Sequence, residues 1–160
     1  MEKLHSDIES VRILISLLVQ KGIKEIVLSP GSRNAPLLVS VAREKRLKHH
    51  VIVDERSAAF FALGIAQQTG QTVALICTSG TALLNYSPAV AEAYYQGIPL
   101  LVISADRPSE WIDQDHSQTI QQQGALCNFV KKSFQLPTAI TCNEDHWHTN
   151  RLVNEAINLS

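Results

Sequence analysis

Apolar residues along the chain form two alternating patterns. Short, nearly continuous apolar runs occur at residues 25–29 (EIVLS), 73–77 (VALIC) and 98–104 (IPLLVIS). Longer stretches, beginning with residues 8–22, carry apolar residues at helical spacing. Near-continuous apolar strands that alternate with helices are typical of a parallel sheet covered on both faces. We therefore expect one α/β domain over residues 1–160, with three α/β/α layers and a mostly parallel sheet of about five to six strands.

Two weaker segments complete the predicted sheet. Residues 50–55 (HVIVDE) predict a strand whose residues 51–54 are buried, and the alternation in residues 129–136 (FVKKSFQL) predicts an edge strand. A helix is expected from Glu55 to about Thr69, another after residues 78–80, and a last one over residues 143–160.

Polar, small or charged residues follow four of the predicted strands. These segments are SPGSRN at 29–34, DERS at 54–57, CTSGT at 77–81 and SADRP at 104–108. Ligands in open α/β sheets bind outside the carboxyl ends of the strands. The four segments therefore predict a ligand-facing rim on the sheet.

Glu55 stands where a predicted strand passes into a helix. An acid in the first helical turn complements the helix dipole, which contributes about 0.3–1 kcal/mol. The apolar sequence AAFFALGIA that follows could also desolvate the carboxylate and raise its pKa, so that it can share a proton. Taken alone, the sequence leaves both explanations open.

The other strand ends each allow a structural and a functional explanation. Ser32 and Arg33 follow a Pro-Gly turn, and Arg107 follows a strand, so both arginines could bind a carboxylate or phosphate or simply lie at the surface. Residues 78–80 predict either a tight turn or a backbone cradle for a ligand, and Gln118 lies in an amide-rich loop. No GxGxxG or GxxxxGK[ST] pattern supports a dinucleotide or P-loop site.

Composition excludes several classes of protein. The chain is 45% hydrophobic and 18% charged, as in a soluble globular domain, and its net charge of −1 gives no footprint for nucleic acid or an anionic membrane. No apolar run is long enough to span a bilayer. Three widely spaced cysteines, Cys77, Cys127 and Cys142, indicate reduced thiols and a cytoplasmic protein. No ligand spacing predicts a metal site within this chain.

Five stretches in combination resemble a known family. They are SPGSRNAPL, DERSAAFFALGIA, TSGTALLNYSPAVAEA, PLLVISADRP and QTIQQ. Over about residues 5–135, the chain resembles the N-terminal pyrimidine-binding domain of the thiamine-diphosphate enzymes. More narrowly, it resembles that of the MenD family of menaquinone-pathway synthases.

The resemblance implies roles for the residues at the rim. Glu55 would be the catalytic acid that hydrogen-bonds N1′ of the cofactor's aminopyrimidine ring, and Thr78, Ser79 and Gly80 would pass close to that ring. Four residues would bind the substrate isochorismate or its adduct: Ser32, Arg33, Arg107 and Gln118.

The family reaction is a transfer between two substrates. It decarboxylates 2-oxoglutarate and adds the resulting succinyl semialdehyde carbanion to isochorismate, giving 2-succinyl-5-enolpyruvyl-6-hydroxy-3-cyclohexene-1-carboxylate. Family members hold Mg²⁺ or Mn²⁺ and the diphosphate in a pyrophosphate-binding domain that carries a GDG sequence, and this chain has none. The resemblance therefore implies a homodimer or homotetramer in which that domain of a second subunit completes the site. The chain alone is expected to be inactive.

Two alternatives remain open at this stage. One is the separate pyrimidine-binding subunit of another thiamine-diphosphate-dependent 2-oxo acid decarboxylase. The other is a non-catalytic α/β module that binds an anion.

Overall fold

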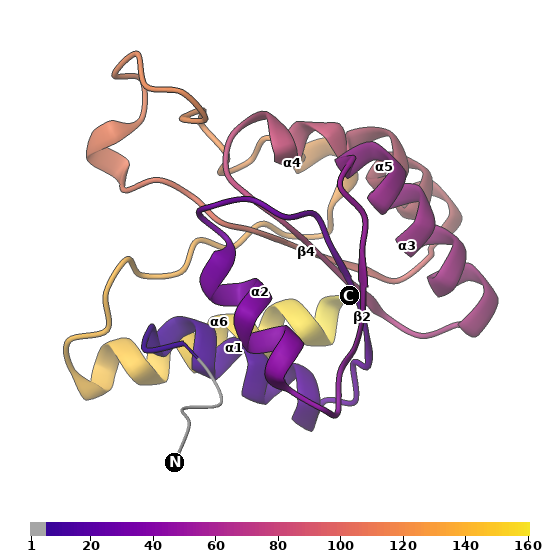
Figure 1. The fold of residues 1–160 in the computed structure, drawn as a ribbon, viewed down its shortest axis with the longest axis horizontal. Helices are drawn as coiled ribbons and strands as arrows, with labels where there is room; N and C mark the ends of the chain where they lie inside the picture. Colours follow the sequence, from indigo (N-terminus) through magenta and orange to yellow (C-terminus); the bar gives the residue numbers. More distant parts are fainter. Residues whose placement is uncertain (1–5) are drawn as a thin grey trace.

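The computed structural model describes residues 6–160, which form a four-stranded sheet with helices on both faces (Figure 1). The elements in chain order are α1 (Glu9–Gln20), β1 (Glu25–Leu28), α2 (Ala35–Arg43), β2 (Lys48–Val51), α3 (Glu55–Thr69), β3 (Val73–Cys77), α4 (Thr81–Asn85), α5 (Ser87–Gln96), β4 (Leu100–Ser104), the 3-10 turns η1 (Ser109–Trp111) and η2 (Cys127–Phe129), and α6 (Asn143–Leu159).

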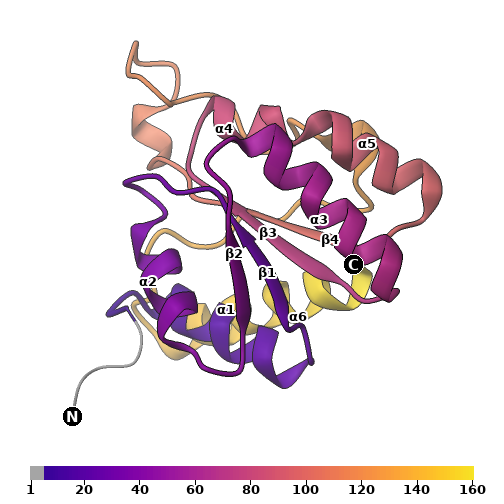
Figure 2. The same cartoon turned by 45° about the vertical axis from the view of Figure 1, so that its right-hand side comes forward.

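All neighbouring strands run parallel, in the order β2-β1-β3-β4. The register pairs Ile26 of β1 with Ala74 of β3, and Ala74 with Leu101 of β4. Parallel strands end at the same edge of a sheet, so the segments after β1, β2, β3 and β4 are brought to one side (Figure 2).

Alternating side chains of the central strands pack into two separate hydrophobic cores. Ile26, Leu28 and Ile76 pack with α1, α2 and α6 on one face. Val27 and Leu75 pack with α3, α4 and α5 on the other face. This alternation follows from the two-residue repeat of a strand. It confirms the predicted three-layer α/β/α class, and Figure 2 shows the two helical layers on either side of the strands.

The sheet has fewer strands than the sequence predicted. Among the described residues there are four rather than five to six, and residues 129–136 form no strand after η2. Lys131 Nζ instead donates to the Leu159 carbonyl, and Lys132 pairs with Glu155, so this segment is held against α6 and not in a ladder with β4. Its alternating pattern reflects side-chain packing alone.

The second strand was also misplaced. It ends at Val51, whereas a buried strand had been expected over residues 51–54, and Val51 and Val53 are 60% and 76% exposed. β2 is an edge strand that pairs with β1 only.

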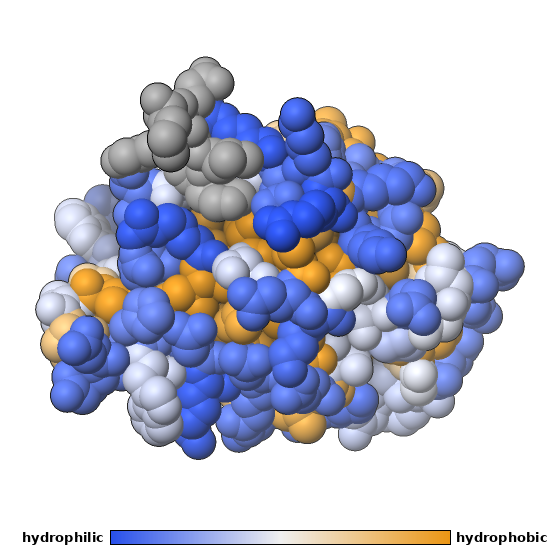
Figure 3. Space-filling model, turned by 90° about the horizontal axis from the view of Figure 1, so that it is seen from below, coloured by the Kyte–Doolittle hydropathy of each residue, from blue (hydrophilic) through white to orange (hydrophobic). Residues whose placement is uncertain are grey.

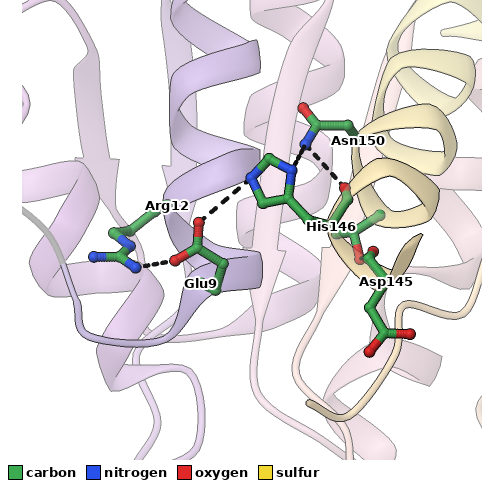
Figure 4. A network of polar contacts seen from close by, with 6 residues as sticks. Glu9, Arg12, Asp145, His146 and Asn150 are labelled. Carbon is green, nitrogen blue, oxygen red and sulfur yellow. Dashed lines mark hydrogen bonds and ion pairs between the residues drawn. The ribbon is translucent and has the colours of Figure 1, made fainter. Parts of the chain in front are cut away.

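The C-terminal helix is fastened to α1 by a polar network, shown in Figure 4. Glu9 pairs with Arg12 and lies 3.6 Å (Oε1 to Nε2) from His146 of α6. Asn150 Nδ2 donates to the His146 carbonyl oxygen at 3.0 Å. These contacts close the layer formed by α1, α2 and α6.

A groove of about 990 Å³ extends along the free edge of β4. Most of its lining is apolar and comes from α1, β4, α6 and the segment around Leu136. From the side of α1 and α6, hydrophobic residues form a band between hydrophilic ones (Figure 3). No helix in residues 6–160 is both long enough and apolar enough to cross a membrane.

Candidate functional site

The ends of three strands are tied directly to one another. Ser29 N, just after β1, donates to the Ile76 carbonyl at 2.8 Å, and Ala105 N, just after β4, donates to the Cys77 carbonyl at 3.1 Å. Gly31 packs so closely on Thr78 that a Cβ at residue 31 would lie 2.5 Å from the Thr78 Cβ. The predicted rim is therefore one continuous surface after β1, β3 and β4.

At the start of α3, the helix cap is Asp54 and not Glu55. The Asp54 Oδ1 atom accepts from Ser57 N at 2.8 Å, and this hydrogen bond lowers the pKa of Asp54. Glu55 occupies the first helical position, is half-buried, and has no hydrogen bond or ion pair within the described chain. The carboxylate of Glu55 is thus left available to a ligand.

Glu55 faces two buried side chains, Cys77 and Tyr86. Burial raises the pKa of the Cys77 thiol to about 12, and the negative charge of Glu55 acts in the same direction. The pKa of Tyr86 is raised as well, mainly by burial, and its hydroxyl donates to Ser29 Oγ at 3.4 Å. The electrostatic effect of Glu55 on both groups places its carboxylate near these buried side chains.

The arginines form a second group with the loop after β4. Arg33 Nη1 donates to Gln118 Oε1 at 3.3 Å, and Arg107 Nη2 donates to the Ser117 carbonyl at 3.4 Å. Burial lowers the pKa of Arg33, and the nearby charge of Arg107 lowers it further. Neither guanidinium forms an ion pair with a carboxylate of residues 6–160. Two close cations without a counter-ion favour an anionic ligand.

Three buried polar atoms at the rim have no hydrogen-bond partner in the described part of the chain. They are Asn34 Oδ1, Thr78 Oγ1 and Arg107 Nε. Buried polar groups are nearly always hydrogen-bonded, so unsatisfied ones need an explanation such as a bound ligand. All three belong to segments that follow strands, where a ligand was expected.

Ser79 and Gly80 contact the loop that carries Gln118. Ser79 Oγ donates to the Gln118 carbonyl at 3.0 Å, and Gly80 has a φ of 80°. A Cβ at residue 80 would lie 2.6 Å from the Gln118 Cα, so only glycine fits there. Ser32 is exposed, and no hydrogen bond of its side chain within residues 6–160 joins it to the arginine group.

The predicted residues therefore form two groups rather than one. Glu55 lies with Cys77 and Tyr86, whereas Arg33, Arg107 and Gln118 lie together. Within residues 6–160, no hydrogen bond or ion pair connects the two groups.

Sequence reasoning missed Gln122. This residue is buried, and its amide bonds both to the turn after β3 and to the end of β4. It is one of three consecutive glutamines, and the one-dimensional pattern gives no sign of which of them points inward.

Comparison with known proteins identifies the family. A family model described as "Thiamine pyrophosphate enzyme, N-terminal TPP binding domain" matches residues 8–126. The chain belongs to this family. The resemblance to the N-terminal domain of thiamine-diphosphate enzymes, inferred from the sequence stretches, is confirmed.

Several relatives share about half of their aligned residues with this chain. The 2-succinyl-5-enolpyruvyl-6-hydroxy-3-cyclohexene-1-carboxylate synthase of Porphyromonas gingivalis is 53% identical over 158 residues, which cover 99% of this chain and 27% of the relative. Proteins of the same name from Cytophaga hutchinsonii and Bacteroides thetaiotaomicron are 53% and 51% identical, over 90% and 96% of this chain and 26% and 28% of their own lengths. The chain thus spans about a quarter of these relatives.

The thiamine-pyrophosphate-binding family implies a cofactor, and the residues present fit its aminopyrimidine ring. Such a ring carries both hydrogen-bond donors and acceptors. Glu55 offers an unengaged carboxylate, and Thr78 Oγ1 and Asn34 Oδ1 are buried without partners. Among the described residues, no cluster of three or more His, Cys, Asp or Glu could hold a metal ion.

Proposed function

We propose that this chain is the pyrimidine-binding part of a synthase that decarboxylates 2-oxoglutarate and adds the remaining four-carbon unit to isochorismate. The product would be 2-succinyl-5-enolpyruvyl-6-hydroxy-3-cyclohexene-1-carboxylate, a step of menaquinone biosynthesis. The relatives that align with nearly all of this chain bear the name of that synthase. The observation that carries the proposal is the arginine pair Arg33 and Arg107, which lies beside Gln118 without a carboxylate partner.

Isochorismate carries two carboxylates, which the arginine pair suits. A guanidinium binds a carboxylate through two parallel hydrogen bonds, a geometry that lysine does not reproduce. Arg33 and Arg107 would bind the substrate's acidic groups, and the Gln118 amide and the exposed Ser32 hydroxyl would complete the polar contacts.

Glu55 would hold a proton at N1′ of the aminopyrimidine ring. Its carboxylate lies near the buried Cys77 and Tyr86 and has no hydrogen bond within residues 6–160, so it is free to hydrogen-bond a ring nitrogen. Thr78, Ser79 and Gly80 would line the approach to the same ring. When bound, thiamine diphosphate supplies an electron sink for decarboxylation of a 2-oxo acid.

The remaining parts of the active site would lie outside this chain. We propose that Mg²⁺ or Mn²⁺ and the diphosphate are held by a pyrophosphate-binding domain of a second subunit, in a cytoplasmic homodimer or homotetramer. Residues 1–160 alone would then lack synthase activity.

The experiment is a comparison of Glu55→Gln with Glu144→Gln in the complete enzyme, supplied with thiamine diphosphate and magnesium. Both are first-turn glutamates, of α3 and α6 respectively, so the control reproduces the loss of a helix-dipole interaction. We expect Glu55→Gln to lower the rate of isochorismate consumption by about 10²–10⁴-fold, the usual contribution of a general acid or base.

Glu144→Gln should leave that rate within about twofold, because a lost dipole interaction of a few tenths of a kcal/mol changes stability and not chemistry. A wild-type enzyme that decarboxylates 2-oxoglutarate but ignores isochorismate would contradict the assigned acceptor. Equal rates for the two variants would show that Glu55 only supports the helix.

A further inference from the structure

We propose that Gln122 is a positioning residue that sets the substrate-facing loop, residues 113–121, against the turn after β3. The inference rests on the proposed function for its link to isochorismate. The contacts themselves belong to this chain alone. Two observations support the proposal: the hydrogen bonds of the buried Gln122 amide and the backbone strain of the loop that precedes it.

The Gln122 amide joins two strand ends. Its Oε1 accepts from Gly80 N, at the start of α4, while its Nε2 donates to the Ala105 carbonyl at 2.9 Å and to Ser104 Oγ at 3.1 Å. Gln122 is 7% exposed, so these groups have little water to replace a lost partner. One side chain thereby fixes the turn after β3 relative to the segment that leads into Arg107.

The loop that precedes Gln122 is conformationally unfavourable. Asp113, Asp115 and Gln118 all have positive φ, at 60°, 54° and 58°. Positive φ is uncommon for non-glycine residues, although aspartate tolerates it better than glutamine, and such strain gathers at functional sites. The loop therefore needs an anchor to keep its shape.

Contacts to the turn after β3 provide that anchor. The Gln118 carbonyl accepts from Ser79 Oγ at 3.0 Å, and the Gln118 Cα lies 2.6 Å from the position that a Cβ of residue 80 would take. In this position the Gln118 Oε1 atom meets Arg33, and the Ser117 carbonyl meets Arg107. Release of Gln122 would let this loop move away from both arginines.

The test uses Gln122→Met, which keeps the length of the side chain but removes its donors and acceptor. Gln123→Met is the matched control, because Gln123 is the adjacent glutamine and its side chain is exposed. We expect amide hydrogen exchange in residues 113–121 to be at least about tenfold faster in Gln122→Met, as the loss of buried hydrogen bonds implies. Exchange in β1 and β3 should stay as in the wild type.

Kinetics of the complete enzyme then test the positioning role. We expect KM for isochorismate to rise about tenfold or more in Gln122→Met, with a larger change in KM than in kcat, because the loop that meets Arg33 and Arg107 is displaced. Gln122→Glu retains an acceptor for Gly80 N but cannot donate to the Ala105 carbonyl. We therefore expect this variant, too, to speed amide exchange in residues 113–121 and to raise KM for isochorismate. This second variant serves if Gln122→Met does not fold.

Equal loop exchange in the Gln122 and Gln123 variants would overturn the proposal. Faster exchange with an unchanged KM would mean that Gln122 stabilises the loop without affecting substrate binding, and this result would also overturn its positioning role. If the wild-type enzyme does not use isochorismate, the proposed function fails. The exchange comparison still decides whether Gln122 holds the loop.

Discussion

Two adjacent acids at the start of α3 have different partners. Asp54 caps the helix through Ser57 N, whereas Glu55 is half-buried beside Cys77 and Tyr86 with no hydrogen bond in residues 6–160. Sequence preference cannot separate them, because both residue types are favoured at a helix N-terminus. The cap therefore belongs to Asp54, whereas Glu55, at the first helical position, can still complement the helix dipole, which is why its proposed ligand role needs the Glu144→Gln control.

The close packing of Gly31 on Thr78 leads to a prediction at the same scale. Gly31→Ala should lower the free energy of unfolding by about 1–3 kcal/mol, the usual cost of forcing a methyl group into a filled space, because its Cβ would lie 2.5 Å from the Thr78 Cβ. Chemical denaturation followed by circular dichroism measures the difference.

Gly64→Ala is the control for this substitution. Gly64 lies within α3, and a Cβ there meets nothing within 4 Å. Alanine is the better helix former, so this variant should gain about 0.5–1 kcal/mol of stability. A Gly31→Ala variant as stable as the wild type would mean that the turn can move away from Thr78.

At the scale of elements, the edge strand β2 is held by ionic contacts to β1 rather than by burial. Glu25 accepts from Lys48 Nζ at 3.1 Å and lies 2.8 Å from His50 Nε2. Partial burial alone would raise the pKa of Glu25, but the hydrogen bonds to His50 and Lys48 outweigh it, and the pKa is lowered. Folding therefore favours the ionised carboxylate.

A carboxylate with a lowered folded-state pKa stabilises the fold above its unfolded pKa, near about 4.3 for glutamate. That stabilisation is lost as the pH falls through the folded-state value. Glu25→Gln should therefore cost about 0.2–1 kcal/mol at pH 7, as expected for partly exposed ion pairs, and the difference from wild type should be smaller at about pH 3 than at pH 7. Urea titrations at both pH values measure it. A constant difference, or one equal to that of the exposed Glu110→Gln, would contradict the assignment.

The sequence predicted the buried elements far better than the exposed ones. β1, β3 and β4 are near-continuous apolar runs because helices cover both of their faces, and this burial leaves a clear pattern. The apolar residues of 50–55 and the alternation of 129–136 gave a similar strand-like pattern, but neither segment is buried between two layers of helices. Val53 is exposed, and the lysines of the second segment bind α6 instead of a strand.

The sequence resemblance assigned Arg33, Arg107 and Gln118 to one substrate site, and their binding roles stay a prediction. In the structure Arg33 hydrogen-bonds Gln118, and the charge of Arg107 is near enough to lower the pKa of Arg33. The anchor formed by Ser79, Gly80 and Gln122 was not predictable, because it depends on a loop that returns to the sheet some forty residues after β3. Such a long-range contact leaves no local periodicity.

At the scale of the whole molecule, exposed apolar side chains surround the start of α3. Val51 and Val53 precede Glu55, and Phe60 and Phe61 follow it, the former 46% exposed. Contiguous exposed apolar patches mark interaction surfaces, and we expect these four side chains to contribute to one. A partner on this surface would exclude water from Glu55, which agrees with the proposal that a second subunit completes the site.

This surface should make residues 1–160 self-associate. Phe60→Asp is expected to weaken that association at least about tenfold, because a charge would replace an apolar anchor in a desolvated contact. Trp147→Asp is the control, since Trp147 is 65% exposed on α6, which packs on the opposite face of the sheet. Sedimentation velocity over a range of concentrations measures the association, and thermal melts check that both variants remain folded. If Trp147→Asp weakens association more than Phe60→Asp, the contact lies on the face of α1 and α6, and the surface around Glu55 is free in this chain.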